Sequence, residues 1–220
     1  MSAVSLPPPR SASVLRNLTP ARARELLAGD ALAIDLRPVG EYLAGHIHGS
    51  IPLLYEAGPG LGGRARDLLP LEARLVLLDD GVSPVERAAD SFRGKGFDVV
   101  GTLAGGVKAW ADPLVTTPVI QLADAPDVLA LIDVSDPGTA LPPAYGVGAS
   151  IPVERLWEES GELGRNWDLG VLAGYGVRAA AAVGILEKLG FTRLTFVRTR
   201  RPGERPPMAP PVVFRAGGPP

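Results

Sequence analysis

The chain has 220 residues with 22 basic and 24 acidic side chains, so its formal net charge is only -2. A charge this small creates no field that would gather nucleic acid or an anionic membrane surface. The hydrophobic fraction of 46% is typical of a globular protein, and the length accommodates one large domain or two small ones. The sequence contains no Cys, which excludes disulfides, thiolate metal sites and thiol nucleophiles on this chain.

The two ends of the chain differ in composition from its middle. Residues 1–16 are rich in Ser and Pro, and residues 200–220 are rich in Pro and poor in periodic apolar positions. We therefore expect a flexible leader and a disordered tail. Because the chain has neither an apolar run of membrane-spanning length nor a secretory signal, we also expect a soluble, cytoplasmic protein.

Short apolar runs alternate with amphipathic segments of helical length between these two ends. Runs at 32–34, 75–78 and 99–100 have the composition of buried strands. Thr19 followed by Pro20 is typical of a helix N-terminus, and that helix is expected to end near residue 29. The alternation predicts an α/β fold with a mainly parallel sheet.

A second helix start follows the strand predicted at 75–78. Ser83 stands at the N-cap position, Pro84 at the first helical position and Glu86 at the third, which makes a capping box. The helix is expected to run to about Arg93 and to be closed by the glycines at 94 and 96.

The second half of the chain repeats short segments of the first half in the same order. Residues 34–36 return as 132–134, 49–52 as 149–152, and 95–97 as 189–191. Two copies of one α/β unit explain this repeat. Pro113 and Pro118 bound the natural linker, 113–118, because Pro disfavours both helix and sheet pairing. The predicted domains are residues 17–112 and 119–199, called here the first and the second unit.

An ordered set of motifs in the first unit resembles a rhodanese domain. The motifs are Ile34-Asp35-Leu36-Arg37, Glu41-Tyr42, residues 45–52, Ala88-Ala89, Gly96-Phe97 and residues 103–110. The second unit resembles a shorter, degenerate copy that keeps 132–134 and 190–191 but loses the Gly-Gly-x-x-Ala-Trp ending. The resemblance implies an α/β protein of two rhodanese-like domains of the thiosulfate sulfurtransferase type, each a mainly parallel sheet flanked by helices.

The resemblance also implies where a catalytic residue would stand. In this family a strand delivers a Cys onto a loop at a helix N-terminus, where backbone amides stabilise its persulfide. Alignment places Asp79 at this position in the first unit and Ala173 in the second. Neither side chain can carry sulfane sulfur, so we expect no catalytic residue, no sulfur transfer by the family's mechanism and no Cys-dependent phosphatase activity.

The two degenerate loops differ in charge. The first consists of Asp79, Asp80, Gly81, Val82, Ser83 and Pro84, whose two carboxylates should repel an anion. The second consists of Ala173, Gly174, Tyr175, Gly176, Val177 and Arg178. It keeps glycines, a helix start and a guanidinium that is able to fork onto an oxyanion. The second loop is therefore the candidate anion-binding site.

The remaining motif residues are interpreted as structural. Asp35 is expected to bond to backbone or to Arg37, Glu41 belongs to the same motif, and His46 is expected to cap or pack. His46 and His48 have no further ligands in their segment, so no metal site is expected. The three Trp side chains, at 110, 157 and 167, are expected in the core or between the units.

These observations favour a catalytically inactive tandem protein that acts as a binding or regulatory module, without a cofactor. Its expected partner is another protein or a small anion, and neither nucleic acid nor a membrane. Three alternatives remain. The first is an enzyme, either with Asp79 as a nucleophile or metal ligand or with a partner's persulfide used for sulfur transfer. The second is a dinucleotide-binding protein that uses the G-x-G-x-x-A motif of 174–179, with Arg193 or Arg198 near a 2′-phosphate, and the third is a purely structural interaction protein.

Overall fold

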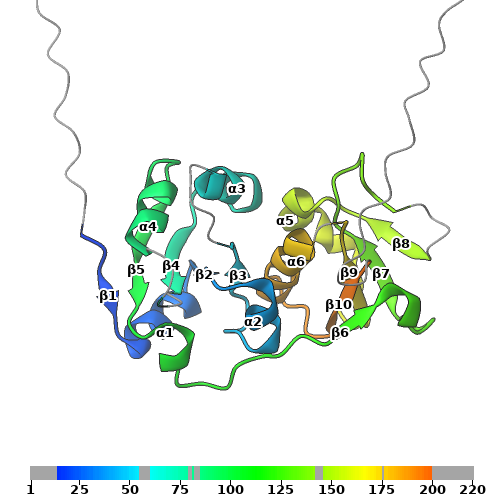
Figure 1. Cartoon of the computed structure of the whole chain (residues 1–220), viewed down its shortest axis with the longest axis horizontal. Helices are drawn as coiled ribbons and strands as arrows, with labels where there is room; N and C mark the ends of the chain where they lie inside the picture. The colour runs from blue at the N-terminus through cyan, green and yellow to red at the C-terminus, as the bar shows by residue number, and fades with distance from the viewer. Residues whose placement is uncertain are drawn as a thin grey trace, which may run out of the picture.

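The computed structural model describes residues 14–54, 60–78, 81, 85–141, 146–174 and 176–199. Within them the chain forms two five-stranded sheets, one in each predicted unit, with helices between and around them (Figure 1). All but three residues of the predicted leader and the whole predicted tail lie outside the described residues.

The first unit contains strands β1 to β5 in the order β1-β5-β4-β2-β3. Its strands are β1 (Asn17–Leu18), β2 (Ala31–Asp35), β3 (Ile51–Pro52), β4 (Arg74–Leu78) and β5 (Asp98–Leu103). Its helices are α1 (Pro20–Ala28), α2 (Val39–Ala44), α3 (Gly60–Leu68) and α4 (Val85–Arg93), with a 3-10 turn η1 (Gly106–Ala109). All neighbouring strands are parallel, as the sequence predicts.

The second unit repeats this arrangement, with the order β6-β10-β9-β7-β8 and only parallel pairs. Its strands are β6 (Val119–Gln121), β7 (Ala130–Asp133), β8 (Val147–Ser150), β9 (Leu169–Leu172) and β10 (Leu194–Arg198). Its helices are α5 (Leu156–Glu159) and α6 (Gly176–Lys188), with 3-10 turns at η2 (Leu122–Asp124), η4 (Val153–Arg155) and η5 (Ser160–Glu162). The matching strand order confirms the two α/β units expected from the repeated segments.

The helix boundaries follow the capping signals. The Thr19 side chain accepts a bond from the backbone amide of Arg22 at 3.3 Å, and α1 begins at Pro20. Ser83 and Pro84 of the predicted capping box lie outside the described residues, but α4 spans Val85–Arg93 as expected. Gly96 and Gly190, which follow α4 and α6, have φ of 99° and 92°, a left-handed conformation that favours glycine at a helix C-terminus.

The register of the two sheets differs where the third strand of each unit pairs with the second. In the first unit Ile34 of β2 pairs with Ile51 of β3, whereas in the second Ile132 of β7 pairs with Ala149 of β8. The sequence alignment of the repeats placed Ile151, not Ala149, opposite this position. The second pairing is therefore displaced by two residues, which keeps each side chain on the same face of the sheet.

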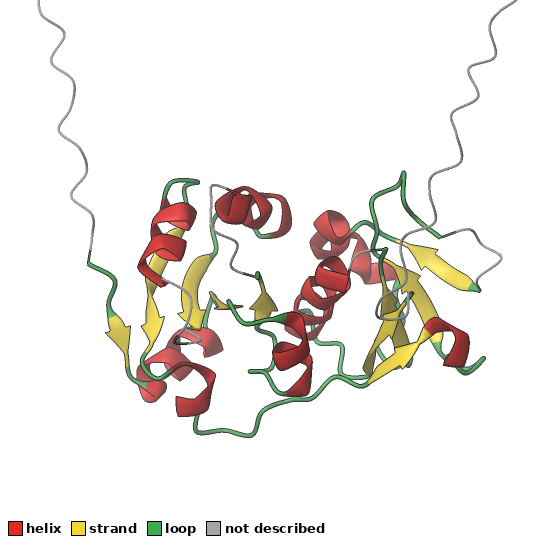
Figure 2. Cartoon of the chain, viewed as in Figure 1, coloured by secondary structure: helices red, strands yellow, loops and turns green. Residues whose placement is uncertain are grey.

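The two units share one hydrophobic core. Helix α6 lies between the two sheets and packs against β3 and α2 of the first unit (Figure 2). Its residues 179–187 are all buried, and one cluster of buried side chains continues from the first sheet through α6 to the second. A helix that is buried on all sides belongs to the interior rather than to a surface. The interface between the units is thus part of the core.

The linker between the units is fastened to the first unit. Val115 and His46 exchange two backbone hydrogen bonds of 2.8 and 2.9 Å, and the Thr117 amide donates to the Leu43 carbonyl at 3.0 Å. The chain therefore passes from one sheet to the other over a defined path.

The Trp side chains divide between core and surface. Trp110 packs on the cluster around α1, and the Trp157 indole donates to the Leu68 carbonyl at 2.7 Å, across the interface between the units. Trp167, in contrast, is 54% exposed, so the expectation of core packing is wrong for this residue. No helix in the described part of the chain is long and apolar enough to cross a bilayer.

Candidate functional site

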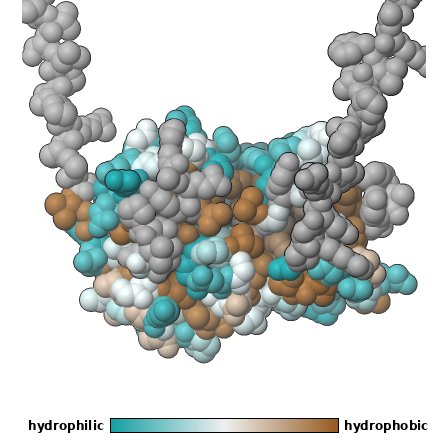
Figure 3. Space-filling view, in the orientation of Figure 1, coloured by the Kyte–Doolittle hydropathy of each residue, from teal (hydrophilic) through white to brown (hydrophobic). Residues whose placement is uncertain are grey.

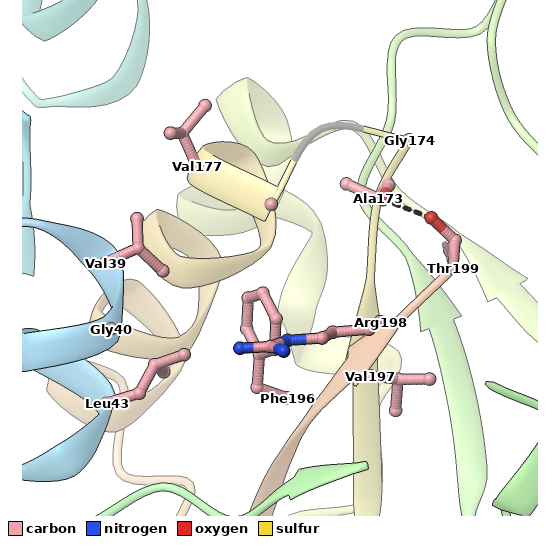
Figure 4. Close-up of a pocket in the computed structure, with 11 residues that line it drawn as sticks. Val39, Gly40, Leu43, Ala173, Gly174, Val177, Phe196, Val197, Arg198 and Thr199 are labelled. Carbon is pink, nitrogen blue, oxygen red and sulfur yellow. Dashed lines mark hydrogen bonds between the residues drawn. The ribbon is translucent and has the colours of Figure 1, made fainter. Parts of the chain in front are cut away.

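The loop after β9 contains Ala173, the position at which the sequence resemblance predicts a Cys. Ala173 directly follows the strand and is 3% exposed, so its methyl group occupies the predicted Cys position. Its carbonyl accepts from the Thr199 hydroxyl at 3.2 Å, and the Gly174 amide donates to the Ser135 hydroxyl at 3.0 Å (Figure 4). Tyr175 lies outside the described residues. The described part of this loop offers neither a nucleophile nor a free Gly174 amide.

Arg178, the proposed anion ligand, is occupied by two carboxylates. Its Nη2 lies 2.6 Å from Glu154 and 3.2 Å from Asp136, and its Nε donates to the Val134 carbonyl at 3.3 Å. The guanidinium therefore ties α6 to neighbouring segments of the second unit. An anion that used Arg178 would compete with both carboxylates, and anion binding by this loop stays a prediction.

Most of the first degenerate loop lies outside the described residues. These are Asp79, Asp80, Val82, Ser83 and Pro84. Gly81 is described, and it lines a cavity of about 280 Å³ together with Arg37, Glu41 and Lys108. A role for Asp79 as a nucleophile or metal ligand accordingly stays a prediction.

The carboxylate of Asp35 has the structural role that was expected. It accepts from the Arg37 amide at 3.0 Å and from the Arg37 guanidinium at 2.7–3.2 Å, while that guanidinium also donates to the Gly45 carbonyl. Asp133 repeats part of this pattern, because it accepts from the Ser135 amide at 2.9 Å. Both aspartates cap the turn after the second strand of their unit.

His46 has a partner that the sequence did not indicate. The ring is fully buried and stacked on Tyr42, its Nδ1 lies 2.9 Å from the Tyr42 carbonyl, and its Nε2 lies 3.0 Å from the Glu187 carboxyl group. Glu187 also accepts from the Gly49 amide at 2.8 Å. His46 thus links the units, whereas His48 is exposed. Glu187 is 141 residues from His46, and no local spacing reports such a pair.

Two further groups at this interface have shifted pKa values. Burial, the Glu187 carboxylate and the Asp35 carboxylate raise the pKa of Tyr42 well above its usual value. Burial lowers the pKa of Lys188, whose ammonium donates to the carbonyls of Leu27 and Ala31. Both groups belong to the packing between the units.

A cavity of about 480 Å³ lies beside the loop after β9. One wall is formed by Val39, Gly40 and Leu43 of α2, and another by Phe196 and Arg198 of β10 (Figure 4). Helix α2 belongs to the first unit, so the cavity spans both. Sequence patterns did not indicate it, because its walls come from segments more than 150 residues apart.

The dinucleotide motif has its expected local setting, since Gly174 follows β9 and Gly176 is the first residue of α6. Arg193, one of two cations proposed near a 2′-phosphate, is paired with Asp168 at 2.6 Å. Arg198 lies at the end of β10 and lines the cavity described above. Dinucleotide binding stays a prediction.

Residues 19–113 match the family model of the rhodanese-like domain. Among solved structures, the chain is similar to the Alr3790 protein of Anabaena sp., with 24% identity, a TM-score of 0.40 and coverage of 45% of this chain and 81% of that chain. It is also similar to thiosulfate sulfurtransferase of Pseudomonas aeruginosa, with 19% identity, a TM-score of 0.40 and coverage of 86% and 44%.

A further similar structure is the 3-mercaptopyruvate sulfotransferase SseA of Escherichia coli, with 16% identity, a TM-score of 0.39 and coverage of 84% of this chain and 98% of that chain. The family match covers the first unit, and the second unit has the same strand order. The chain therefore carries a rhodanese-like domain at residues 19–113, followed by a second unit with the same strand order, and its sequence contains no cysteine.

Proposed function

We propose that this chain is a non-catalytic rhodanese-like protein that acts as a binding or regulatory module. The observation that carries the proposal is the absence of Cys from all 220 residues, together with the buried methyl group of Ala173 at the end of β9. A persulfide requires a thiolate, and an alanine side chain has no nucleophilic atom. What the fold retains is a pair of units with a common core and a cavity between them.

The test is a sulfur-transfer assay of the purified chain with thiosulfate or 3-mercaptopyruvate as donor and cyanide as acceptor. We expect no turnover above the rate without protein. Ala173→Cys places a thiol at the end of β9, and mass spectrometry after incubation with thiosulfate would detect an added sulfur atom if the loop still favours a persulfide. Turnover by the unmodified chain would refute the proposal.

A second candidate is an accessory role in which a partner protein supplies the persulfide. It is favoured only by the family to which the first unit belongs. Mixing the chain with an active sulfurtransferase distinguishes the two roles. An increase in that enzyme's turnover would support the accessory role over a ligand-binding one.

Small-anion binding by the second loop is tested by thermal shift with thiosulfate, sulfate, phosphate or NADP⁺. A ligand present at a hundred times its Kd stabilises the folded state by about 2.7 kcal/mol. Because Arg178 already contacts two carboxylates, we expect each of these anions to stabilise the folded state by much less than that value. A large shift that disappears in Arg178→Ala would show that the anion displaces Glu154 and Asp136.

A further inference from the structure

We propose that the cavity between α2 and β10 binds a carboxylate with an apolar tail, and that Arg198 holds the carboxylate. This inference rests on the proposed binding role. It adds to that role the chemical class of the ligand. The cavity's volume of about 480 Å³ lies within the range of about 300–1,000 Å³ that is usual for small-molecule sites.

The walls of the cavity are mainly apolar. Val39 and Leu43 line it from α2, Phe196 from β10, and Val177 from its edge at the first turn of α6 (Figure 4). Val177 is 45% exposed, and hydrophobic residues reach the surface where the two units meet in the view of Figure 3. Leu43 and Phe196 are already buried, so an apolar tail placed here would mainly remove its own surface and that of Val177 from water, and it would gain the free energy of that burial.

Arg198 is the only charged residue among the described residues that line the cavity. It follows Phe196 by two positions on β10, so both side chains project from the same face of the strand. In Figure 4 its side chain extends from β10 toward the side on which α2 lies. The charge of the site is therefore positive, which favours an anion over a cation or a neutral ligand.

The guanidinium of Arg198 differs from its neighbours in having no carboxylate partner within the described part of the chain. Arg178 is paired with Glu154 and Asp136, and Arg193 with Asp168. An arginine fork without a protein carboxylate offers two parallel donors to a ligand carboxylate. Arg198 is also partly buried, which strengthens such a pair relative to one in open water.

Two of the glycines that line the cavity have open space beside them. A Cβ atom added at Gly40 or Gly174 would meet no heavy atom within 4 Å, so the space beside both residues is empty. Gly40 lies in the first turn of α2, where a larger side chain suits the helix better than glycine does. Gly40→Leu is therefore a means of filling the cavity without removing any existing contact.

The first experiment is calorimetric titration of the full chain with acetate, butyrate, hexanoate and octanoate, each below its aggregation threshold. Each added methylene group should tighten binding about threefold to fourfold until the cavity is full. Octanol, which has the tail without the charge, should bind about tenfold more weakly than octanoate. Equal affinities for acetate and octanoate, or for octanol and octanoate, would overturn the proposal.

Variants then separate the charge from the tail. Arg198→Met keeps the length of the side chain, and we expect about tenfold weaker octanoate binding with octanol binding unchanged. Arg22→Met, on the exposed face of α1, is the matched control and should change neither. Gly40→Leu should abolish both, whereas Gly63→Leu on α3, whose added Cβ also meets open space, should not.

Methyl NMR locates the ligand in the unmodified chain, so its result does not depend on whether a variant folds correctly. Octanoate should shift the methyl signals of Val39, Leu43 and Val177 in the unmodified chain. Shifts confined to other methyl groups would overturn the assignment of the site. The sulfur-transfer assay has a separate readout, so turnover by the chain would refute the non-catalytic role without deciding whether the cavity binds octanoate.

Discussion

The two units have the same strand order but cover their sheets differently. In the first, a cluster of ten buried residues around α1 fills the outer face, and the inner face joins the shared core. In the second, the outer face buries only Leu131, Leu172 and Val197, beneath segments between 120 and 147 that contain no α-helix among the described residues. The second unit therefore depends on its inner face for most of its hydrophobic burial.

This difference shows how a degenerate repeat remains folded. Helix α6 belongs to the second unit by sequence but is buried against β3 and α2 of the first. Because burial of apolar surface is the main stabilising contribution to folding, loss of this contact removes a large share of the second unit's stability and a smaller share of the first unit's. We expect the two units to unfold together as long as α6 remains in place.

The largest loss of stability is expected from the substitution of Gly184 by a residue with a side chain. A Cβ there would lie 2.2 Å from the Ser50 carbonyl oxygen and 3.0 Å from Ile51 Cα, both backbone atoms that are unable to rotate away. Gly184→Ala should lower the free energy of unfolding by about 3 kcal/mol, at the upper end for overpacking. Urea denaturation measures this loss, and near-ultraviolet circular dichroism should show the second unit losing structure first.

Gly63→Ala is the matched control for that substitution, because it lies in α3 with open space around the added Cβ. It should stabilise the protein by about 0.5–1 kcal/mol through helix propensity. Equal destabilisation by the two variants would show that the close approach of α6 to β3 does not hold the units together.

The next effect is expected at Glu187, which accepts from the Gly49 amide and hydrogen-bonds to His46. Glu187→Ala should cost about 2 kcal/mol, because it leaves the buried Nε2 of His46 and the Gly49 amide without their partner. Glu187→Gln should cost less, since its amide oxygen still accepts from Gly49 and its amide nitrogen donates to a neutral His46. The stability of both Glu187 variants is measured by thermal unfolding with circular dichroism, with Glu158→Ala as a control at an exposed position. Equal losses at Glu187 and Glu158 would argue against a buried pair.

The fold could be predicted further from the sequence than the site could. Capping at Thr19 and the motif at Asp35 depend on residues within a few positions, so their spacing reports the contact directly. The His46–Glu187 pair and the cavity at Arg198 join segments more than 140 residues apart, which no local pattern encodes. Arg178 shows a related limit, because its residue type does not report that its neighbours in space are carboxylates.

A smaller effect is expected at Tyr42, whose hydroxyl donates to the Ser50 carbonyl at 2.8 Å beside α6. Tyr42→Phe should cost about 1 kcal/mol near neutral pH, because it removes this bond. The pKa of Tyr42 is raised by burial and by two carboxylates, so the unfolded chain loses the phenolic proton at a lower pH than the folded one. The advantage of the unmodified protein over Tyr42→Phe is full below about pH 10 and should shrink as the pH rises above it. A constant difference across that range, measured by urea denaturation, would contradict the shift.

The smallest change in the free energy of unfolding is expected from substitution of Lys188, because its hydrogen bonds and its burial act in opposite directions. Its ammonium donates to the carbonyls of Leu27 and Ala31, but burial disfavours the charge and lowers its pKa. Lys188→Met keeps the aliphatic length, and its effect on the free energy of unfolding at neutral pH should stay below about 1 kcal/mol. Between the lowered pKa and the usual value near 10.4, the unfolded chain binds more protons at this site than the folded chain does. The stability of the unmodified protein relative to Lys188→Met should therefore rise with pH in that window, opposite in sign to the effect at Tyr42. Urea denaturation of both proteins at several pH values measures the slope, and a relative stability that falls with pH would mean that the carbonyl bonds outweigh the loss of hydration.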